Sequence, residues 1–320
     1  MRRIVFALVA TIVAVALTSV SILATGRNCS LAAGAAAGRS LARTPWGDPD
    51  LQGVWSGAAS LLVPFDRDPA LGTRNVVTEE EFRARVERQL KGASSSNIEA
   101  TNFGIEPDLT PATSHQASLV VDPPDGRRPP RTAAAESRRP RRNSFVPGVF
   151  ASVADLGLFD RCIAYNAVPT LLPVSDIEIV QAPGQVAIRS EIIHEARVIP
   201  LDRRARVNAG FASYAGDSRG RWDGQTLVVE TTNLNGLTSL SGDAPPLTER
   251  VTVVERFTLI DHDHLSYEAT IDDPGTWTRP WTVAFPRQRD ERHPLYEYAC
   301  HEGNYSLANV LRASRAVDAR

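Results

Sequence analysis

The chain has 320 residues, of which 42% are hydrophobic and 22% are charged. This balance is typical of a globular protein and excludes a collagen-like or fully disordered chain. The formal net charge is only −2, which disfavours nucleic acid as a partner because bulk electrostatic attraction is missing. Lys91 is the only lysine, so Schiff-base and pyridoxal chemistry have a single candidate, in a helix predicted to be exposed.

Residues 1–37 are typical of a secretory signal. Two arginines precede an apolar run over residues 4–24, and small residues follow up to Ala37. The apolar run is also long enough to span a bilayer, so an uncleaved inner-membrane anchor is the alternative. We expect a periplasmic or secreted protein that contacts the membrane only through this segment, if the segment is not cleaved.

Two cysteines remain after cleavage, Cys162 and Cys300. Two distant cysteines in an oxidising compartment can pair, so the sequence favours a disulfide. Two separate buried thiols are the alternative.

Residues 38–149 are predicted to wrap the rest of the fold. Thr78 and Glu81 form a capping box in front of an amphipathic pattern, which predicts a short helix over 79–91. An Arg/Pro-rich stretch follows at 127–142. It indicates a solvated surface loop rather than an anion-binding patch, because no aromatic residue lies between the arginines.

From Ile177 onward hydrophobic residues alternate with polar ones, the pattern of half-buried strands. In residues 185–199 we place Val186, Ile188, Ala196 and Val198 on one face with His194. Further strands are expected at 226–232, 249–260, 265–272, 278–285 and 295–301. The fold class is therefore mainly β, an antiparallel lipocalin-like β-barrel or a sandwich over residues 150–312, with a C-terminal tail at 313–320.

Four sequence blocks carry a family resemblance. They are PWGDPDLQGVW from Pro45, GDSRGRWDG from Gly216, DPGTWTRPW from Asp273 and YEYACHEGNY from Tyr296. Together they resemble an uncharacterised family of exported bacterial proteins, which implies export but no reaction. Separately, Gly53-Val54-Trp55 is similar to the Gly-x-Trp that opens lipocalin-like barrels. That resemblance implies a barrel with a lumen large enough for a ligand.

Polar residues on faces expected to be apolar are the first candidates for chemistry. His194 would face the interior and act as an acid or base, unless it is a core histidine satisfied by one hydrogen bond. Glu255 shares a face with Val253 and Phe257 and could serve as an acid. A buried arginine partner such as Arg279 would make Glu255 merely structural.

The remaining candidates lie near expected strand ends. We predict that His301 shares acid–base duty with His194, oriented by Glu302 or Asn304, although a hydrogen-bonded turn is the alternative. Asp217 is grouped with the catalytic set. The predicted substrate-binding set comprises Arg219 as an oxyanion or carboxylate clamp, Trp222 and Trp281 as apolar walls, Arg279, Glu255, Tyr298 and Asn304.

No motif for a nucleotide, haem or zinc is found, so we expect no cofactor and no metal. His262 and His264 lie in a tight turn that favours solvent exposure. These patterns predict an exported enzyme that uses acid–base chemistry, as a lyase, isomerase or hydrolase, on a small and partly apolar organic molecule in the barrel lumen. A lipocalin-like carrier of an apolar ligand and a cell-envelope interaction protein are the alternatives.

Overall fold

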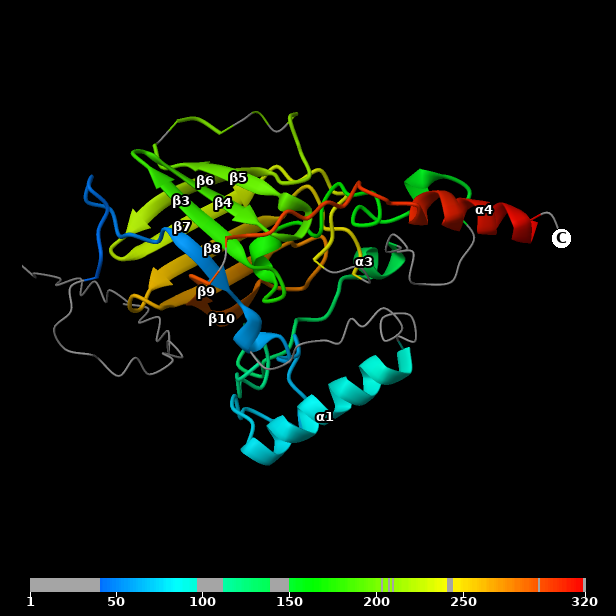
Figure 1. Cartoon of the computed structure of the whole chain (residues 1–320), viewed down its shortest axis with the longest axis horizontal. Coiled ribbons are helices and arrows are strands. Elements are labelled where there is room, and N and C mark those ends of the chain that lie inside the picture. The colour runs from blue at the N-terminus through cyan, green and yellow to red at the C-terminus, as the bar shows by residue number, and fades with distance from the viewer. Residues whose placement is uncertain are drawn as a thin grey trace, which may run out of the picture. The chain divides into compact units, whose positions relative to one another are not determined.

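The computed structural model describes residues 41–96, 112–138, 150–202, 204–206, 208, 210–240, 244–292 and 294–318 (Figure 1). The predicted signal or anchor at 1–37 lies outside these residues. Among the described residues, no helix is long and apolar enough to cross a membrane.

The fold is mainly β. Its strands are β1 (Gly53–Ser56), β2 (Val120–Asp122), β3 (Ile177–Ala182), β4 (Gln185–Ser190), β5 (Ala196–Pro200), β6 (Asp217–Asp223), β7 (Thr226–Thr232), β8 (Thr252–Leu259), β9 (His264–Asp272) and β10 (Trp281–Arg289). The α-helices are α1 (Glu79–Ser96), α3 (Ala133–Ser137) and α4 (Ser306–Asp318), and short 3₁₀ turns include η4 (Pro169–Leu171) and η5 (Ile192–His194).

Nine strands form a nearly closed antiparallel barrel, which confirms the predicted fold class. The strand order is β5-β4-β3-β1-β10-β9-β8-β7-β6, and every neighbouring pair on this path is antiparallel. Because nine is odd, strict alternation leaves β5 and β6 running in the same direction where the barrel closes. Side chains pack across this seam: a Cβ added to Gly220 on β6 would lie 2.6 Å from Leu201 Cδ2 and 2.9 Å from Ile199 Cγ2.

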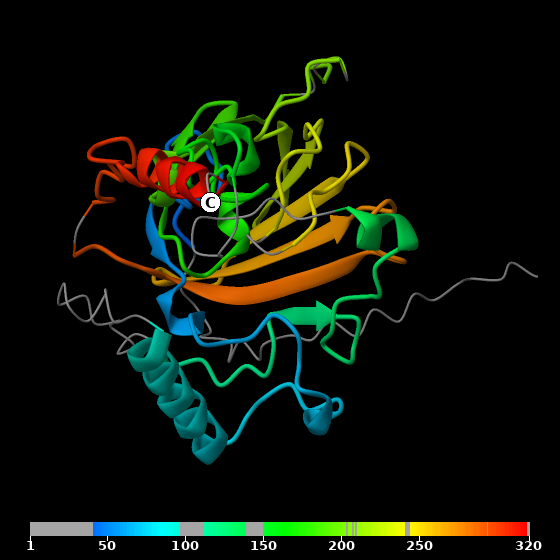
Figure 2. The ribbon, with the colours of Figure 1, turned by 90° about the vertical axis from the view of Figure 1, so that its right-hand side faces the viewer.

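The segment before residue 150 contributes strands to the sheet as well as covering the barrel. β1 lies between β3 and β10 through the pairs Trp55↔Ile177 and Trp55↔Arg289. β2 adds to β10 outside the nine-strand path, as Figure 2 shows below the two long orange strands. By their contacts, the described residues before and after residue 150 belong to one compact unit.

Helix α1 begins where the capping box predicts. The Thr78 backbone N–H donates to Glu81 Oε2 at 2.7 Å, and the Glu81 N–H donates to Thr78 Oγ1 at 3.2 Å. The two bonds satisfy donors that a helix start leaves without partners. The helix continues to Ser96, beyond the predicted end at residue 91.

The Arg/Pro-rich stretch is more ordered than a solvated loop over its described part. Arg128 pairs with Asp66 at 2.7 Å and lies over the Phe65 ring. Arg138 follows α3 and donates to the Gly275 carbonyl oxygen at 3.1 Å. The interpretation as a solvated loop is therefore wrong for these two arginines, whose side chains tie the stretch to its neighbours. Residues 139–149 lie outside the described part.

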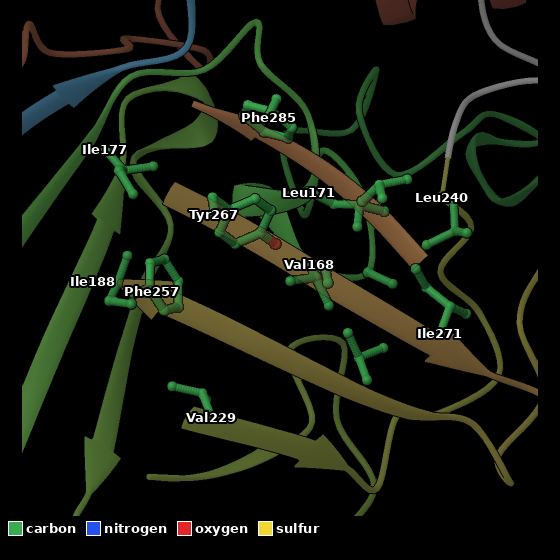
Figure 3. Close-up of a cluster of buried hydrophobic side chains, with 14 of the residues drawn as sticks. Val168, Leu171, Ile177, Ile188, Val229, Leu240, Phe257, Tyr267, Ile271 and Phe285 are labelled. Carbon is green, nitrogen blue, oxygen red and sulfur yellow. The ribbon is translucent and has the colours of Figure 1, made fainter. Parts of the chain in front are cut away.

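The barrel interior is filled by side chains and by a segment of the chain itself. Inward-facing Phe257, Tyr267 and Phe285 lie on neighbouring strands and pack in sequence, with ring centroids 5.1 Å apart in each pair. Residues 166–172, which we call the plug, enter this interior, and Val168 and Leu171 are completely buried against the strands (Figure 3). The open lumen that the lipocalin resemblance implied is therefore occupied by the plug.

Three sequence predictions of secondary structure are corrected. Residues 295–301 form no strand, and residues 306–318 form α4, so the predicted tail at 313–320 begins inside a helix. Strand β6 was missed. The two-residue turn Gly224-Gln225 joins β6 to β7, and its glycine, which has a φ of 61° as tight hairpins need, could have revealed the strand before it.

Candidate functional site

A polar cluster lies in the middle of the apolar barrel interior. Arg197 on β5 makes a two-pronged ion pair with Glu255 on β8, with Nη1 to Oε2 at 2.6 Å and Nη2 to Oε1 at 3.0 Å. Thr170 of the plug donates to the same carboxylate, and the Tyr267 hydroxyl donates to it at 3.1 Å. Burial, together with the negative charge of Glu255, raises the pKa of Tyr267 well above its usual range.

This cluster serves the fold rather than a substrate. Glu255 is fully buried, as predicted, but its arginine partner is Arg197 and not Arg279. Because Arg197, Thr170 and Tyr267 use both carboxylate oxygens, Glu255 is held as a structural anion. The cluster therefore joins β5, β8 and β9 to the plug.

A second buried arginine holds the plug by its backbone. Arg287 on β10 is fully buried and donates to the carbonyl oxygens of Thr170 at 2.8 Å, Leu172 at 3.1 Å and Ser175 at 2.9 Å. Its guanidinium lies 5.1 Å from the ring centre of Phe285. Burial lowers the pKa of Arg287 to about 10, which still leaves it charged at neutral pH.

Glu195 is an unusual carboxyl that the sequence analysis missed. It directly precedes β5, and one of its oxygens, Oε2, is buried with no hydrogen-bond partner among the described residues. Burial raises its pKa to about 7, although the positive charge of Arg197 lowers it in part. The alternation that predicts an inward His194 puts the next residue, Glu195, on the outer face, where no such shift would arise.

We expect this carboxyl to make stability depend on pH. The pKa of Glu195 is about 7 in the fold against an ordinary value of 4.5, so the folded state holds a proton that the unfolded chain releases first. The free energy of unfolding should therefore fall by roughly 3 kcal/mol as pH rises from about 4.5 to 7, and then level off. Urea denaturation of Glu195→Gln should show this slope removed and a gain in stability at pH 8.

Glu80, exposed on α1, provides the matched control for this measurement. Glu80→Gln should keep the wild-type dependence on pH. An unchanged slope in Glu195→Gln would show that another group binds the proton.

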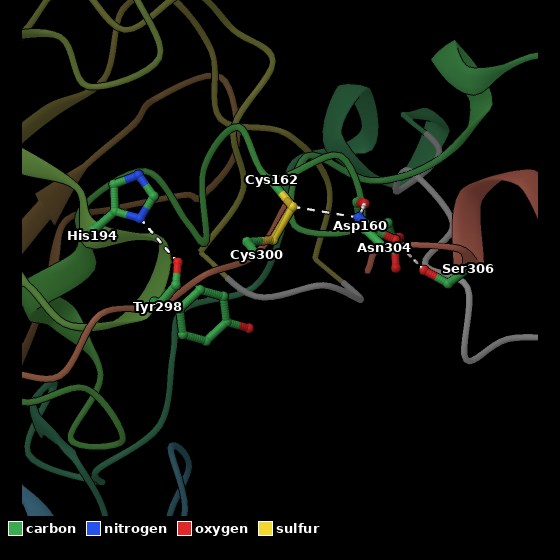
Figure 4. The surroundings of a disulfide bond; sticks show 7 residues. All are labelled: Asp160, Cys162, His194, Tyr298, Cys300, Asn304 and Ser306. Atoms are coloured by element: carbon green, nitrogen blue, oxygen red, sulfur yellow. Dashed lines mark hydrogen bonds between the residues drawn. A yellow bond between two sulfur atoms is a disulfide. The ribbon is translucent and has the colours of Figure 1, made fainter. Parts of the chain in front are cut away.

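A groove beside the disulfide collects several of the predicted site residues. Cys162 and Cys300 are bonded, as predicted, with Cα atoms 5.8 Å apart (Figure 4). The bond joins residues 159–162 to residues 297–306, and a groove of about 500 Å³ lies between the two segments. Its lining residues are Phe159, Asp160, Glu297, Tyr298, Ala299, Cys300, Asn304 and Ser306.

Tyr298 and Asn304 are the two predicted substrate-binding residues that line this groove. The Tyr298 side chain is half-buried, and burial raises the pKa of its phenol above the usual value. The Asn304 side-chain amide donates to the Asp160 carbonyl oxygen at 3.3 Å and to Cys162 Sγ at 3.5 Å. Tyr298 therefore offers a proton donor to the groove. Asn304 holds the segment of Asp160 and Cys162, which forms the other wall, in place through its side-chain hydrogen bonds.

The predicted pair of histidines is not arranged as expected. His194 lies in η5 and is exposed, not on an inward strand face, and His301 and Glu302 are exposed as well. The His194 ring instead makes a 3.1 Å hydrogen bond through Nδ1 to the Tyr298 carbonyl oxygen (Figure 4). With both imidazoles in solvent, shared acid–base duty in a closed lumen loses its geometric basis.

Asp217 and Arg219 bind each other rather than a ligand. Arg219 Nη1 lies 2.6 Å from Asp217 Oδ1, and the guanidinium also donates to the Ala205 carbonyl oxygen at 3.2 Å. Both residues stand on the outer face of β6, because Ser218 and Gly220 point inward toward Thr231 and Ile199. The expected oxyanion clamp is therefore already neutralised by its own carboxylate.

The tryptophans and Arg279 divide between the interior and the surface. Trp281 is completely buried and packs edge-on against Trp277 at 5.2 Å, so it belongs to the core. Trp222 is half-buried against the same core. Arg279 is exposed before β10 begins, so it does not enter the barrel interior to bind a ligand there.

The histidine-rich turn before β9 is exposed. His262 bonds to Asp263 at 2.7 Å and His264 bonds to Asp261 at 2.8 Å, so each ring is paired with a carboxylate of the same turn. Within the described part of the chain, no group of three or more potential ligands could hold a metal ion.

The fold and its site define a plugged antiparallel β-barrel protein with a disulfide-bounded groove of small-molecule size. No family model matches the chain, and no curated protein matches it either.

Proposed function

We propose that this chain is an exported enzyme that performs acid–base chemistry on a small organic molecule bound in the disulfide-bounded groove. Lyase, isomerase and hydrolase reactions belong to this class. The predicted export is supported by the Cys162–Cys300 disulfide, because such bonds persist in oxidising compartments.

The observation that carries the proposal is the pairing of a carboxylate and a phenol on one wall of the groove. Glu297 is exposed and makes no hydrogen bond or ion pair within the described residues, so it is available to take up a proton. Tyr298 follows directly, and its raised pKa keeps the phenol protonated at neutral pH. A base beside a neutral donor is the minimum arrangement for proton transfer next to a carbonyl.

In such a reaction Glu297 removes a proton from the carbon next to a carbonyl group. The electron pair of the broken C–H bond moves to the carbonyl oxygen, where the Tyr298 hydroxyl donates a hydrogen bond to the developing charge. When the electron pair moves back from the oxygen and a proton returns to the opposite face of the same carbon, the configuration at that carbon is inverted without any redox change. His194 acts as a positioning residue, because its ring is bonded to the Tyr298 backbone.

A carrier of an apolar ligand is less well supported. The barrel lumen that such a carrier would use is filled by the plug.

The test compares the wild-type protein with Glu297→Gln on a metabolite extract followed by mass spectrometry. Compounds converted by the wild type should be converted 10²–10⁴-fold more slowly by the variant, the usual contribution of a catalytic base. Glu291→Gln is the control, because Glu291 is an exposed carboxyl that does not line the groove. Equal conversion by wild type and Glu297→Gln would exclude Glu297 as the base.

A further inference from the structure

The outer face of the barrel is polar on some strands and apolar on others. Every outward residue of β9 is polar, as expected for a sheet with one face in water: His264, Ser266, Glu268, Thr270 and Asp272. On β3, β4 and β5 most outward residues are apolar. We call this set the β3–β5 face, and its members are Glu178, Val180, Ala182, Gln185, Ala187, Arg189, Ala196, Val198 and Pro200. This part of the outer face therefore has the composition of a covered surface.

Two valines in the middle of the β3–β5 face are strongly exposed. Val180 on β3 is 50% exposed and Val198 on β5 is 62% exposed. Both are in register with Ala187 on β4, through the pairs Val180↔Ala187 and Ala187↔Val198. Because neighbouring strands lie about 4.8 Å apart, the three side chains form one apolar row about 10 Å long. A continuous exposed apolar patch with polar residues at its border is typical of an interaction surface.

An ion pair beside this row has unused bonding capacity. Arg189 Nε and Nη2 both bond to the same oxygen of Glu178, Oε2, at 3.0 and 2.9 Å. Within the described residues, Glu178 Oε1 and Arg189 Nη1 make no hydrogen bond or ion pair, and both side chains are partly exposed. The pair therefore offers one acceptor and one donor of opposite charge to a partner that lies over the face.

We propose that a second copy of this chain binds to the β3–β5 face, sheet against sheet, around a twofold axis that runs parallel to the strands between β3 and β4. Such an axis places β3 of one copy over β4 of the other. Because Glu178 and Arg189 are in register, Glu178 of each copy then lies opposite Arg189 of the other, and Val180 lies opposite Ala187.

Charge complementarity is the reason that the occupant is a second copy. A surface that carries both charges of a pair on neighbouring strands is complementary to itself when the axis exchanges those strands. None of the residues that line the groove belongs to the β3–β5 face, so the dimer does not depend on the proposed function.

The size of the face sets the expected affinity. Three strands about 4.8 Å apart, over a length of about 17 Å, cover roughly 250 Å² on each copy. A stable interface buries about 800 Å² on each partner, so the dimer should be weak even with a border of neighbouring side chains. We expect a dissociation constant of about 10–100 µM, and therefore a monomer at about 1 µM.

Sedimentation velocity of the exported protein, from about 1 µM to about 300 µM, measures the association. The sedimentation coefficient should rise with concentration from the value of a monomer toward that of a dimer. Val180→Lys should weaken the association at least tenfold, because it places a charge in the middle of the interface. Val76→Lys, at a valine that is 54% exposed and lies outside the face, should leave the association unchanged. Wild-type protein that stays monomeric over the whole range would overturn the proposal.

Two charge variants test the position of the axis. Glu178→Arg leaves two arginines at the paired positions and Arg189→Glu leaves two glutamates, so each variant places like charges opposite each other in its own dimer. Each variant alone should associate at least tenfold more weakly than the wild type. An equimolar mixture places an arginine opposite a glutamate at each contact and should form a heterodimer about as strong as the wild-type dimer.

Arg256→Glu is the control for the change in net charge. Arg256 on β8 is partly exposed and pairs with Asp223 at 3.0 Å, on another part of the outer face. This variant should associate like the wild type. An equal loss in Arg256→Glu would show that net charge alone governs association, and a mixture that stays monomeric although the wild type dimerises would exclude this axis. Either result would reject the proposal.

Discussion

Replacing Arg197 by methionine is expected to lower the free energy of unfolding by roughly 3–5 kcal/mol, the cost of leaving a buried charge without its partner. Arg197 and Glu255 are both buried, and together they connect β5 and β8 with the plug. Without the guanidinium, the Glu255 carboxylate must stay unpaired or take up a proton. Urea denaturation followed by tryptophan fluorescence measures the change.

The double variant Arg197→Met with Glu255→Leu distinguishes two contributions to the free energy of unfolding: the cost of a buried charge without a partner, and the stabilisation by the ion pair itself. We expect it to recover much of the lost stability, because well-packed apolar residues can replace a buried ion pair at little cost. Thr170 and Tyr267 would then lose a hydrogen-bond acceptor, so recovery should be incomplete. A double variant that is less stable than the single one would show that the pair itself stabilises the fold.

Arg189 on β4 supplies the matched control. It pairs with Glu178 at 2.9 Å, but both side chains are partly exposed. Exposed ion pairs contribute at most about 1 kcal/mol, so Arg189→Met should have a small effect. A loss as large as that of Arg197→Met would mean that burial does not set the cost.

Removal of the disulfide is the second change with a large expected effect. Cys162 and Cys300 are separated by 138 residues, and closing a loop of that length restricts the unfolded chain by about 5 kcal/mol of free energy in the loop-closure estimate. The double variant Cys162→Ser with Cys300→Ser should lose stability on that order. Chemical denaturation with and without a reducing agent measures it.

Reduced wild-type protein is the internal control, because it should match the serine variant. The reducing agent should not change the serine variant further. A loss well below 1 kcal/mol would show that the two segments that form the groove are held together without the bond.

Much of the local structure could be predicted from the sequence. Period-two alternation predicts most of the strands, because a strand with one face in the core must alternate. The Thr78–Glu81 capping box predicts the start of α1, since it depends on residues three apart. The disulfide could be predicted because only two cysteines remain after the predicted signal segment, and an oxidising compartment favours their pairing. The resemblance to exported bacterial proteins stays a prediction.

The candidate site was predicted only in part. Tyr298 and Asn304 are predicted from the polar segment near an expected strand end, whereas Phe159, Asp160 and Glu297 carry no local pattern that marks a groove. The groove exists because two segments far apart in the chain meet at the disulfide. Which side chains face each other there depends on tertiary contacts alone.

The tertiary structure also decided which face of β5 points inward. Five residues separate β4 from β5, and the pairing Arg189↔Ala196 joins an odd position to an even one. The inward set therefore changes from even numbers on β4 to odd numbers on β5, across a turn where Ile193 and His194 have left-handed φ values of 62° and 45°. Alternation by itself shows that every second residue of a strand faces inward, but not which of the two sets does so. The turn before β5 decides this, and as a result Arg197 is buried whereas His194 and Val198 are exposed.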